Sequence, residues 1–594
     1  MPARIRHLTV LSAVLLLLAA GQAPAQSYLD LQDQVQEFTL DNGVRFLVLE
    51  KHDVPVFSFR TFVNVGSANE TRGITGLSHI LEHMAFKGTA EIGTTDYKAE
   101  LKAMQAEDAA FDAFKQVRLA IKPVLAEYEL HVSRIPEDGL DEFRALEAAL
   151  KDLPVEIAVA GEDGGPVGDD LFENGGKAKV TINHAMGTEQ EKVDDFTVGE
   201  EAYRALSFYL EDVKDLKEDY IAKEAAFEAA KDAAREFVVT NEYGKIVENN
   251  GGSGLNAYTS SDVTVYLYNL PSNRLELWAY LEGSRMADPV LREFYTEKDG
   301  PVTEERRMRT DNNPIGRLIE QFQNLMFMAN GYHHGTIGYM SDIQNISRAD
   351  CRAYFEKNYV GSNIVVALVG DVEFDEVRKY AEKYFADIPA GRPEPVETFE
   401  PEQLGEKRFV MKDPSQPLYI AGYHLENVQH PDWPIYEVIA DVLGQGRTSR
   451  LHKSLVKEQQ IAINAMTFPG FPGQKYETGL LVFAMPVKDK TALDLEAAIE
   501  AEIQKIVDEG ITAEELAGVK QRARANFIRG LDGNAGMASQ LAWYQTYMGD
   551  WRKLFAEVER INAVTLDDVK RVAGEIFQKD NRTVAIIETE QKES

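Results

Sequence analysis

The sequence has a single cysteine, Cys351, in 594 residues. One cysteine excludes a disulfide within the chain and a metal cluster built from thiolates. Basic residues are also scarce, since 63 Lys and Arg stand against 97 Asp and Glu and give a formal net charge of -34. Such a surface repels the phosphates of nucleic acids and of anionic membranes, so we expect neither as a partner. Any metal must therefore be held by His, Asp or Glu.

No apolar run reaches the ~20 residues that a membrane-spanning helix needs. An apolar run at residues 8–20 follows Arg4 and Arg6 and precedes the small residues at 23–25. This order is typical of a secretory signal peptide, so we predict that residues 1–25 are removed on export. We expect the mature protein in the periplasm, with secretion as the alternative, and without a membrane span.

The rest of the chain has the pattern of two copies of one α+β unit. Residues 37–64 alternate as strands around an Asp-Asn-Gly turn, and a helix is predicted from about Ile74. Strand and helix patterns return in the same order over residues 407–451, after a stretch rich in Pro and Glu at 389–402. The predicted fold class is α+β, with two homologous α/β-sandwich repeats joined by a linker.

The first copy is longer than the second. From about residue 98 to about residue 247 the composition shifts to Ala, Glu, Asp and Lys with helical periodicity, interrupted by a loop rich in Gly and Asp. We predict a helical insertion, with long helices that project as a hairpin joined by a flexible tip. Solvated helix faces explain its charge, and a clamp for a partner or substrate is the alternative.

A group of residues suited to metal chemistry follows Gly76. His79 and His83 stand four residues apart, with Glu82 between them. On a helix this spacing puts both imidazoles on one face, where they can share a zinc ion. The carboxylate of Glu82 can then take a proton from an activated water molecule. A pair of surface or capping histidines is the alternative interpretation of the same residues.

Two further segments favour the metal site. The run NAYTSSDVTVYLYNLP, which begins at Asn256, alternates as an edge strand does and follows a Gly-rich stretch. The run EKDGPVTEERRMR places several carboxylates at a predicted helix start, with Pro301 in the first turn. Two His ligands and one carboxylate from this helix would leave a fourth position on zinc for water.

Taken in order, HILEHMAFKGT, NAYTSSDVTVY, EERRMR and the two-fold repeat resemble the pitrilysin/insulinase family of zinc metallopeptidases, the inverzincins. Within the family, the chain is similar to the two-domain bacterial branch that resembles the mitochondrial processing peptidase. The resemblance implies a half-clamshell fold and one Zn2+ per chain, with His79 and His83 as ligands and Glu82 as the catalytic base. It also implies that one strand pairs with the substrate backbone, through Asn256, Ala257, Tyr258 and Thr259.

The third ligand follows from the same resemblance. In the family a helical Glu ligates zinc, and a Glu seven residues earlier is its outer partner; Glu297 and Glu304 have that spacing here. Alignment on RRMR instead selects Glu305, with one residue inserted near Gly300. We favour Glu305, because an insertion is easier before a helix than within it. Glu304 stays the alternative, and Glu297 is the expected outer partner.

The second repeat lacks groups that the resemblance leads us to expect. Family members of this size form half of a clamshell whose other half supplies an Arg and a Tyr that stabilise the oxyanion. By register these positions fall at Val456 and Ile463, which carry no side-chain donor. We therefore expect a heterodimer with a zinc-less homologue that carries the Arg/Tyr pair. A homodimer that uses Arg447 or Arg450 is the alternative.

The resulting prediction is an exported zinc-dependent endopeptidase subunit that hydrolyses peptides or unfolded segments, using a Glu base and metal-activated water. Its domains would be the signal peptide at 1–25, an N-terminal zinc peptidase domain at 26–398 interrupted by the insertion, and a C-terminal domain without metal at 399–594. The alternative is a non-catalytic or scaffolding subunit, although a decayed site would be expected to lose some of the motif residues. A zinc hydrolase of non-peptide substrates fits the strand at Asn256 less well.

Overall fold

The computed structural model describes residues 31–150, 155–161, 164–167, 169–173, 175–184, 192–393, 395–396 and 398–590. These residues form two compact units, of which unit 1 combines Met1–Tyr97 with Phe237–Ser594 and unit 2 is Lys98–Glu236, each over its described part. The predicted signal peptide at residues 1–25 lies outside the described residues. Within them, no helix combines the length and the apolar character that crossing a membrane requires. The domain limits at 26–398 and 399–594 stay predictions.

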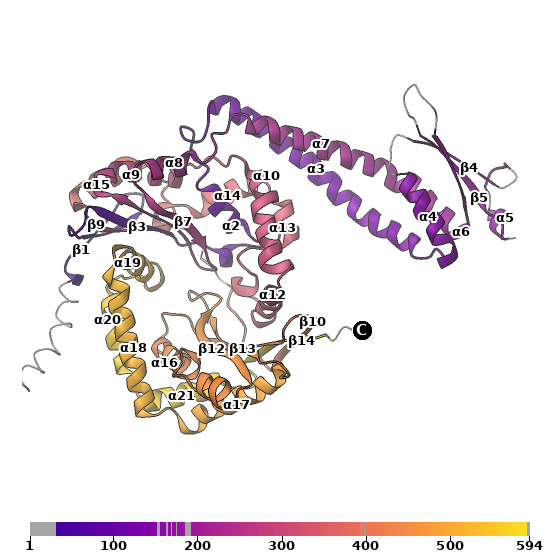
Figure 1. Cartoon of the computed structure of the whole chain (residues 1–594). Coiled ribbons are helices and arrows are strands. Elements are labelled where there is room, and N and C mark those ends of the chain that lie inside the picture. The colour runs from indigo at the N-terminus through magenta and orange to yellow at the C-terminus, as the bar shows by residue number, and fades with distance from the viewer. Residues whose placement is uncertain are drawn as a thin grey trace, which may run out of the picture. The chain divides into compact units, whose positions relative to one another are not determined.

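Unit 1 contains two mixed sheets (Figure 1). The first has the order β1-β2-β9-β3-β8-β7, with bounds β1 Val35–Thr39, β2 Arg45–Glu50, β3 Val56–Val63, β7 Ser253–Thr259, β8 Thr264–Pro271 and β9 Ile364–Gly370. The second has the order β10-β14-β11-β13-β12, with bounds β10 Lys407–Asp413, β11 Leu418–Leu425, β12 Ala462–Phe471, β13 Thr478–Pro486 and β14 Arg582–Thr589.

The two sheets repeat one topology. In the first, β2 runs parallel to β9, and β3, β8 and β7 follow as successive antiparallel neighbours. In the second, β10 runs parallel to β14, and β11, β13 and β12 follow in the same manner. Strand β1 is an addition to the first sheet. The predicted fold of two homologous α+β repeats is confirmed, and β7 and β12 occupy equivalent sheet edges.

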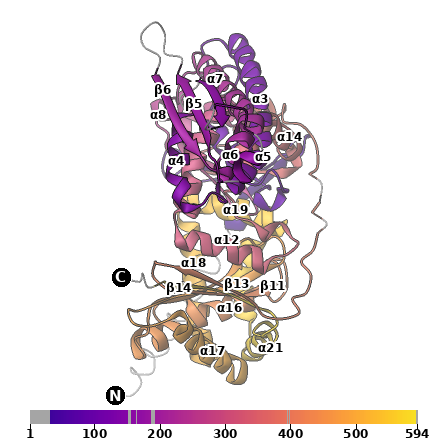
Figure 2. The same cartoon turned by 90° about the vertical axis from the view of Figure 1, so that its right-hand side faces the viewer.

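Helices cover both faces of each sheet. Those of the first repeat have the bounds α2 Leu77–Met84, α8 Glu242–Asn249, α9 Leu275–Ala287, α10 Phe294–Glu297, α11 Thr303–Arg306, α12 Pro314–Met326, α13 Met340–Asn345, α14 Arg348–Asn358 and α15 Phe374–Tyr384. Those of the second are α16 Trp433–Gly444, α17 Ala492–Glu509, α18 Ala513–Asp532, α19 Asn534–Met548, α20 Lys553–Ala563 and α21 Leu566–Ile576. Figure 2 shows α12 on one side of the second sheet and α16, α17 and α21 on the other.

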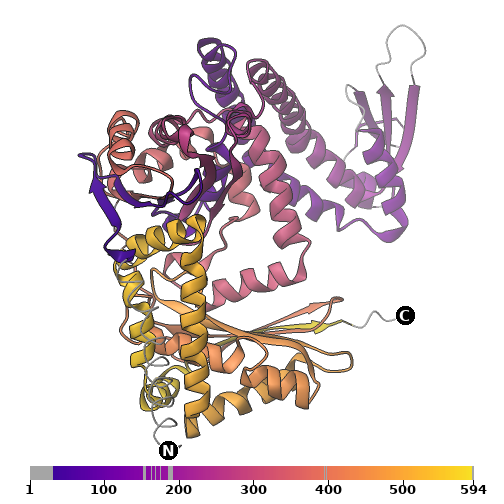
Figure 3. The same ribbon diagram turned by 60° about the vertical axis from the view of Figure 1, so that its left-hand side comes forward.

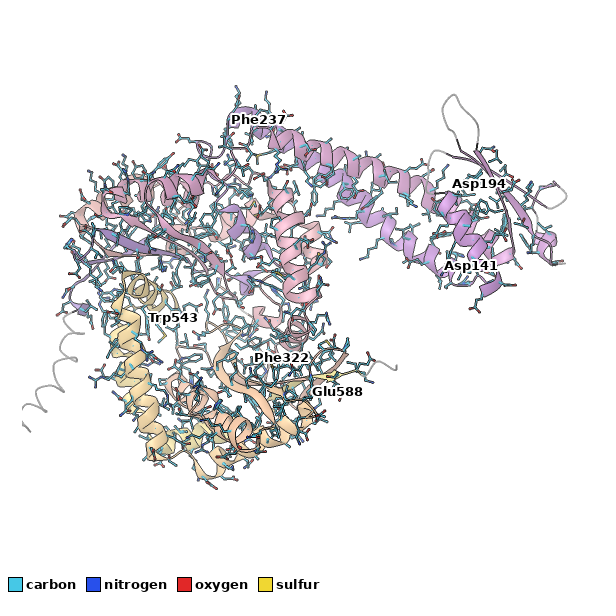
Figure 4. All side chains as sticks on the ribbon, viewed as in Figure 1. Asp141, Asp194, Phe237, Phe322, Trp543 and Glu588 are labelled. Atoms are coloured by element: carbon cyan, nitrogen blue, oxygen red, sulfur yellow. The ribbon has the colours of Figure 1, made fainter. Side chains whose placement is uncertain are left out.

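Each repeat lends one helix to the sheet of the other. Helix α19 packs on β3 and β9. Figure 3 shows yellow helices of the second repeat beside the indigo strands of the first. Conversely, α12 presents Leu318, Phe322 and Met326 to a core that includes Leu418 and Ile587 of the second sheet; Phe322 is labelled in Figure 4. The two repeats therefore share their hydrophobic cores, which stabilises them as one unit.

Unit 2 is built on two long helices, α3 Tyr97–Val132 and α7 Lys214–Arg235. They lie side by side, with the rings of Phe111 and Phe227 5.5 Å apart. Beyond them the chain forms a small subdomain with its own core. Its elements are α4 Glu137–Ala149, β4 Val155–Gly161, α5 Asp169–Glu173, β5 Ala178–His184, β6 Lys192–Val198 and α6 Glu200–Phe208.

The long helices of the insertion were predicted, but the flexible tip is wrong. Strands β4, β5 and β6 form an antiparallel sheet there, and α4 and α6 pack with it around Phe143 and Leu206. The short runs VEIAVAG, AKVTINH and KVDDFTV have strand-like alternation. The Gly- and Asp-rich segment between β4 and β5 concealed this pattern, because its composition is that of a loop.

Candidate functional site

Helix α2 carries the two histidines and is fixed at its first turn. Gly76 precedes it with φ 90°, and a Cβ there would lie 2.4 Å from the Ile337 carbonyl oxygen, so only glycine fits. The carboxylate of Glu70 accepts hydrogen bonds from the backbone N–H groups of Gly76 and Ser78, each at 2.7 Å. Burial raises the pKa of Glu70 to about 8, although both N–H groups act in the opposite direction. This cap sets where the helix starts and thus which face it presents.

His79 and His83 lie on one face of α2, as their spacing predicted. Their ring centroids are 4.8 Å apart at an interplanar angle of 81°. His79 is buried at 8% exposure, and His83 is partly buried. The imidazoles are therefore held close together within the protein, away from the freely solvated surface.

The acidic helix brings a carboxylate to the same place. Glu305 Oε2 lies 3.4 Å from His79 Nε2 and 3.6 Å from His83 Nε2. The hydrogen bond with His79 and the nearby charges lower the pKa of Glu305 to about 2 despite some burial. Glu304 points elsewhere: its side chain is 66% exposed and pairs with Arg307. The structure thus groups Glu305, and not Glu304, with the two histidines.

The helix that carries these carboxylates does not begin near Pro301, as the sequence suggested. It begins at Phe294 and continues through a π-helical segment, Lys298–Val302, into α11. In a regular α-helix, Glu297 and Glu305 would be about 80° apart around the axis, whereas a spacing of seven residues returns to the same face. A π turn takes up one additional residue. The extra residue therefore lies within the helix, and both carboxylates still face the histidines.

Glu297 lies on the outer side of His83. Its Oε1 is 3.0 Å from His83 Nδ1, so Nδ1–H donates to the carboxylate and Nε2 is left toward Glu305. Lys87 Nζ contacts Glu297 Oε2 at 2.7 Å and Glu293 Oε2 at 3.2 Å. Burial acts to raise the pKa of Glu297, but the hydrogen bonds from His83 and Lys87 hold it at about 2. His83 is thus oriented by a carboxylate that is itself held by a lysine.

This donor set fits zinc. The ligand atoms of His79, His83 and Glu305 lie within 4.8 Å of one another. Tetrahedral zinc with bonds of roughly 2.1 Å separates its ligand atoms by about 3.4 Å, close to both measured contacts of Glu305. A histidine whose second nitrogen donates to a carboxylate is the usual arrangement at such ions. Two imidazoles and one carboxylate also leave the fourth position open.

A second group, Glu50, His52 and Glu373, also has its ligand atoms within 4.8 Å. It lies at the surface, where the side chain of His52 is 50% exposed and that of Glu373 is 66% exposed. His52 Nδ1 is 2.7 Å from Asp371, and this hydrogen bond raises the pKa of His52. His52 thus lies in a surface cluster with the carboxylates of Glu50, Asp371 and Glu373, where its contacts are those of an exposed ion-pair group.

Glu82 lies on α2 beside the edge strand β7. Thr259, the last residue of β7, donates a hydrogen bond from Oγ1 to Glu82 Oε2 at 2.6 Å. Strand β7 pairs with β8 on one side, with Ala257 opposite Tyr266, and no other described strand pairs with its outer edge. Asn256 and Tyr258 are exposed along it. A strand with a free edge next to His79, His83 and Glu305 can receive an extended peptide.

The second repeat has different groups at the equivalent place. Helix α16 contains no histidine. Val456 packs against the hydrophobic core, and Ile463 on β12 is 54% exposed. Arg450 Nε and Nη2 each lie 2.8 Å from the Glu515 carboxylate, so its guanidinium is already engaged. Arg447 is exposed.

Sequence reasoning missed Lys87, Glu293 and the hydroxyl of Thr259 as parts of this site. Lys87 lies only four residues after His83, just beyond the end of α2, so its closeness in sequence was an available signal. Glu293 and Thr259 reach the site through tertiary packing, for which the local sequence gives no sign.

Two family models match the chain: "Insulinase (Peptidase family M16)" over residues 45–122 and "Peptidase M16 inactive domain" over residues 345–523. The zinc protease PqqE of Helicobacter pylori is 30% identical over 358 residues, which cover 58% of this chain and 78% of that protein. The mitochondrial-processing peptidase subunit beta of Blastocladiella emersonii is 26% identical over 349 residues, covering 57% of this chain and 74% of that protein.

Solved structures agree on the fold. The crystal structure of a protease from Helicobacter pylori superposes with a TM-score of 0.64 at 22% identity, covering 93% of this chain and 99% of that one. The periplasmic protease PqqL from Escherichia coli gives a TM-score of 0.58 at 14% identity, covering 94% of this chain and 48% of that one.

Proposed function

Since the chain belongs to the insulinase family of peptidases, family M16, we propose that it is an exported zinc-dependent endopeptidase that acts on peptides and unfolded segments. The observation that carries this proposal is the convergence of His79 Nε2, His83 Nε2 and Glu305 Oε2, with Glu82 on the same helix. The related proteins named zinc proteases support the choice of metal and reaction.

His79, His83 and Glu305 would hold one zinc ion per chain. When bound, zinc supplies Lewis-acid polarisation of a carbonyl group and lowers the pKa of water toward 7. Glu297 keeps the Nδ1 proton of His83 in place, so that Nε2 is available as a ligand atom. Glu82 accepts a proton from the attacking water at its carboxylate and returns it to the leaving amine.

The substrate would add to the sheet as a further strand along β7. Backbone groups of Asn256, Ala257, Tyr258 and Thr259 would pair with an extended peptide. Main-chain hydrogen bonds supply the affinity in such pairing, so it depends less on the peptide's side chains than on its extended backbone. Most strands of a folded protein are already paired on both sides, whereas peptides and unfolded segments have free extended backbone, so these are the expected substrates. This requirement also favours peptides over the small non-peptide substrates of other zinc hydrolases.

We propose that the chain works as one subunit of a heterodimer. Neither Val456 nor Ile463 can donate a side-chain hydrogen bond to an oxyanion, so a zinc-less homologue would supply an Arg and a Tyr. The match to a processing-peptidase subunit is consistent with a two-subunit enzyme. A homodimer is the alternative, and there Arg447 is the better donor because Arg450 is bound to Glu515.

Export is proposed from the signal-peptide pattern of residues 1–25. The likeness in fold to a periplasmic protease agrees with that location. The alternative function is a non-catalytic or scaffolding subunit. The match of residues 345–523 to a domain described as inactive concerns the part of the chain that lacks the histidine motif, so it leaves the first repeat as the place of any catalysis.

The test is the Glu82→Gln variant beside the wild-type protein, each purified and loaded with zinc. We expect E82Q to keep its zinc and to lose hydrolysis of unstructured peptides, because the amide cannot accept the proton. Equal activity of the two proteins would refute the mechanism, and a wild-type protein inactive with every partner would favour the scaffolding role. Strong hydrolysis by the wild-type chain alone would refute the heterodimer.

A further inference from the structure

Thr259 joins two parts of the proposed site through one side chain. It ends strand β7, where it pairs with Thr264 of β8. Its Oγ1 donates to Glu82 Oε2 over 2.6 Å, a length typical of a hydroxyl that donates to a carboxylate. The two residues are 177 positions apart in sequence. A strand suited to substrate and the proposed base are therefore in direct contact.

The rest of the surroundings would leave Glu82 without a fixed direction. Glu82 is partly exposed. The nearby Tyr266 and Tyr359 are buried and form a hydrogen bond with each other, with 2.8 Å between their hydroxyl oxygens. Among the hydrogen bonds of the described side chains, the one from Thr259 is the bond that reaches the Glu82 carboxylate. It engages Oε2, and no hydrogen bond from the described side chains engages the other oxygen.

We propose that Thr259 is a positioning residue, whose hydroxyl holds the Glu82 carboxylate in the direction required for proton transfer. This inference rests on the proposed endopeptidase function. A carboxylate that is already held pays no orientational cost at each turnover, so the bond acts on the chemical step. Because the same strand pairs with the substrate, its docking fixes the scissile bond relative to the base.

The experiment compares Thr259→Val with Thr259→Ser. Valine keeps the branched shape and the strand preference of threonine but has no hydroxyl, whereas serine keeps the hydroxyl. For T259V we expect kcat to fall by about tenfold, as for loss of one hydrogen bond to a charged group, with KM within about twofold of wild type. For T259S we expect kcat within about threefold of wild type. Zinc content and unfolding temperature should match wild type in both.

Two results would overturn the positioning role: a T259V kcat equal to that of wild type, or T259S impaired as strongly as T259V. An effect confined to KM would also overturn it, because the side chain would then serve binding alone. Crystal structures of the zinc-loaded wild type and T259V add a readout that needs no activity. We expect the Glu82 carboxylate to turn away in T259V, and an unmoved carboxylate would refute the inference even if the wild type were found inactive.

Discussion

The bond between His83 and Glu297 leads to a quantitative prediction for zinc affinity. Glu297 accepts from two donors, His83 Nδ1–H at Oε1 and Lys87 Nζ at Oε2. Glutamine has one oxygen and one NH2 group, so Glu297→Gln can accept from one of them and must turn a donor toward the other. Removal of an outer partner of a ligand histidine typically costs 10–100-fold in metal affinity, or about 1.4–2.7 kcal/mol. We expect E297Q to fall in this range.

Variants of Lys87 test why E297Q would lose zinc affinity. Lys87→Met removes one of the two donors and leaves the carboxylate bound to His83, so we expect a loss of only about threefold. In the double variant E297Q/K87M the amide oxygen can turn to His83 Nδ1–H, and its NH2 group faces the space that Lys87 occupied. We therefore expect the double variant to bind zinc more tightly than E297Q alone.

The assay is competition with a chromophoric chelator at fixed pH, with zinc dissociation constants measured for the purified proteins. Glu304→Gln is the matched control, because Glu304 lies on the same helix, is 66% exposed and pairs with the half-exposed Arg307. Affinity of E297Q within twofold of wild type would refute the role of Glu297. If the losses of E297Q and K87M simply add in the double variant, competition between His83 and Lys87 for the one amide oxygen is not the cause of the lost affinity.

Two further predictions concern other carboxylates. We expect Glu305→Gln to lose most of its bound zinc while E304Q retains it, as measured by metal analysis after dialysis; zinc retained by E305Q would exclude Glu305 as the third ligand. Burial, with the charge of Glu557 close by, raises the pKa of Glu437 to about 7 from 4.5. The contribution of the protonated Glu437 to the free energy of unfolding is therefore complete below pH 4.5 and is lost as pH rises through 7. The shift corresponds to about 3 kcal/mol, reduced to roughly 2 by residual contact with water. In urea unfolding with chelator, the free energy of unfolding of E437Q should rise by that amount relative to wild type between pH 4.5 and 8. A difference between the two proteins that stays constant with pH would contradict the prediction.

Sequence periodicity predicted the parts of the site that lie within single elements. A spacing of four residues put His79 and His83 on one helical face, and strand alternation marked β7 before its neighbours were known. The repeated order of strands and helices likewise predicted both sheets. These features depend on the dihedral periods of helix and strand, which any local window of sequence contains.

Irregular helical turns and tertiary contacts could not be predicted from these periods. Gly300 and Pro301 indicate a helix boundary by composition, yet the helix passes through them as a π turn. Only the tertiary contacts of Glu297 and Glu305 show that the additional residue has been absorbed there. Similarly, Lys87 meets Glu293 across 206 residues, and no sequence rule predicts that pairing.

The insertion separates His83 from Glu305 in sequence without moving them apart in space, and the structure gives a physical reason. Where the chain leaves unit 1 and returns, Thr94 and Val238 form an antiparallel bridge. Thr95 N donates to the Phe237 carbonyl oxygen at 2.8 Å, and Val239 N donates to Gly93 at 3.0 Å. These bonds close the ends of the insertion before it begins, so its length adds no freedom to the elements that carry the site. The cost of closing the insertion is therefore met by this backbone bridge and not by His83 and Glu305, so a unit of this size can be accommodated at that point.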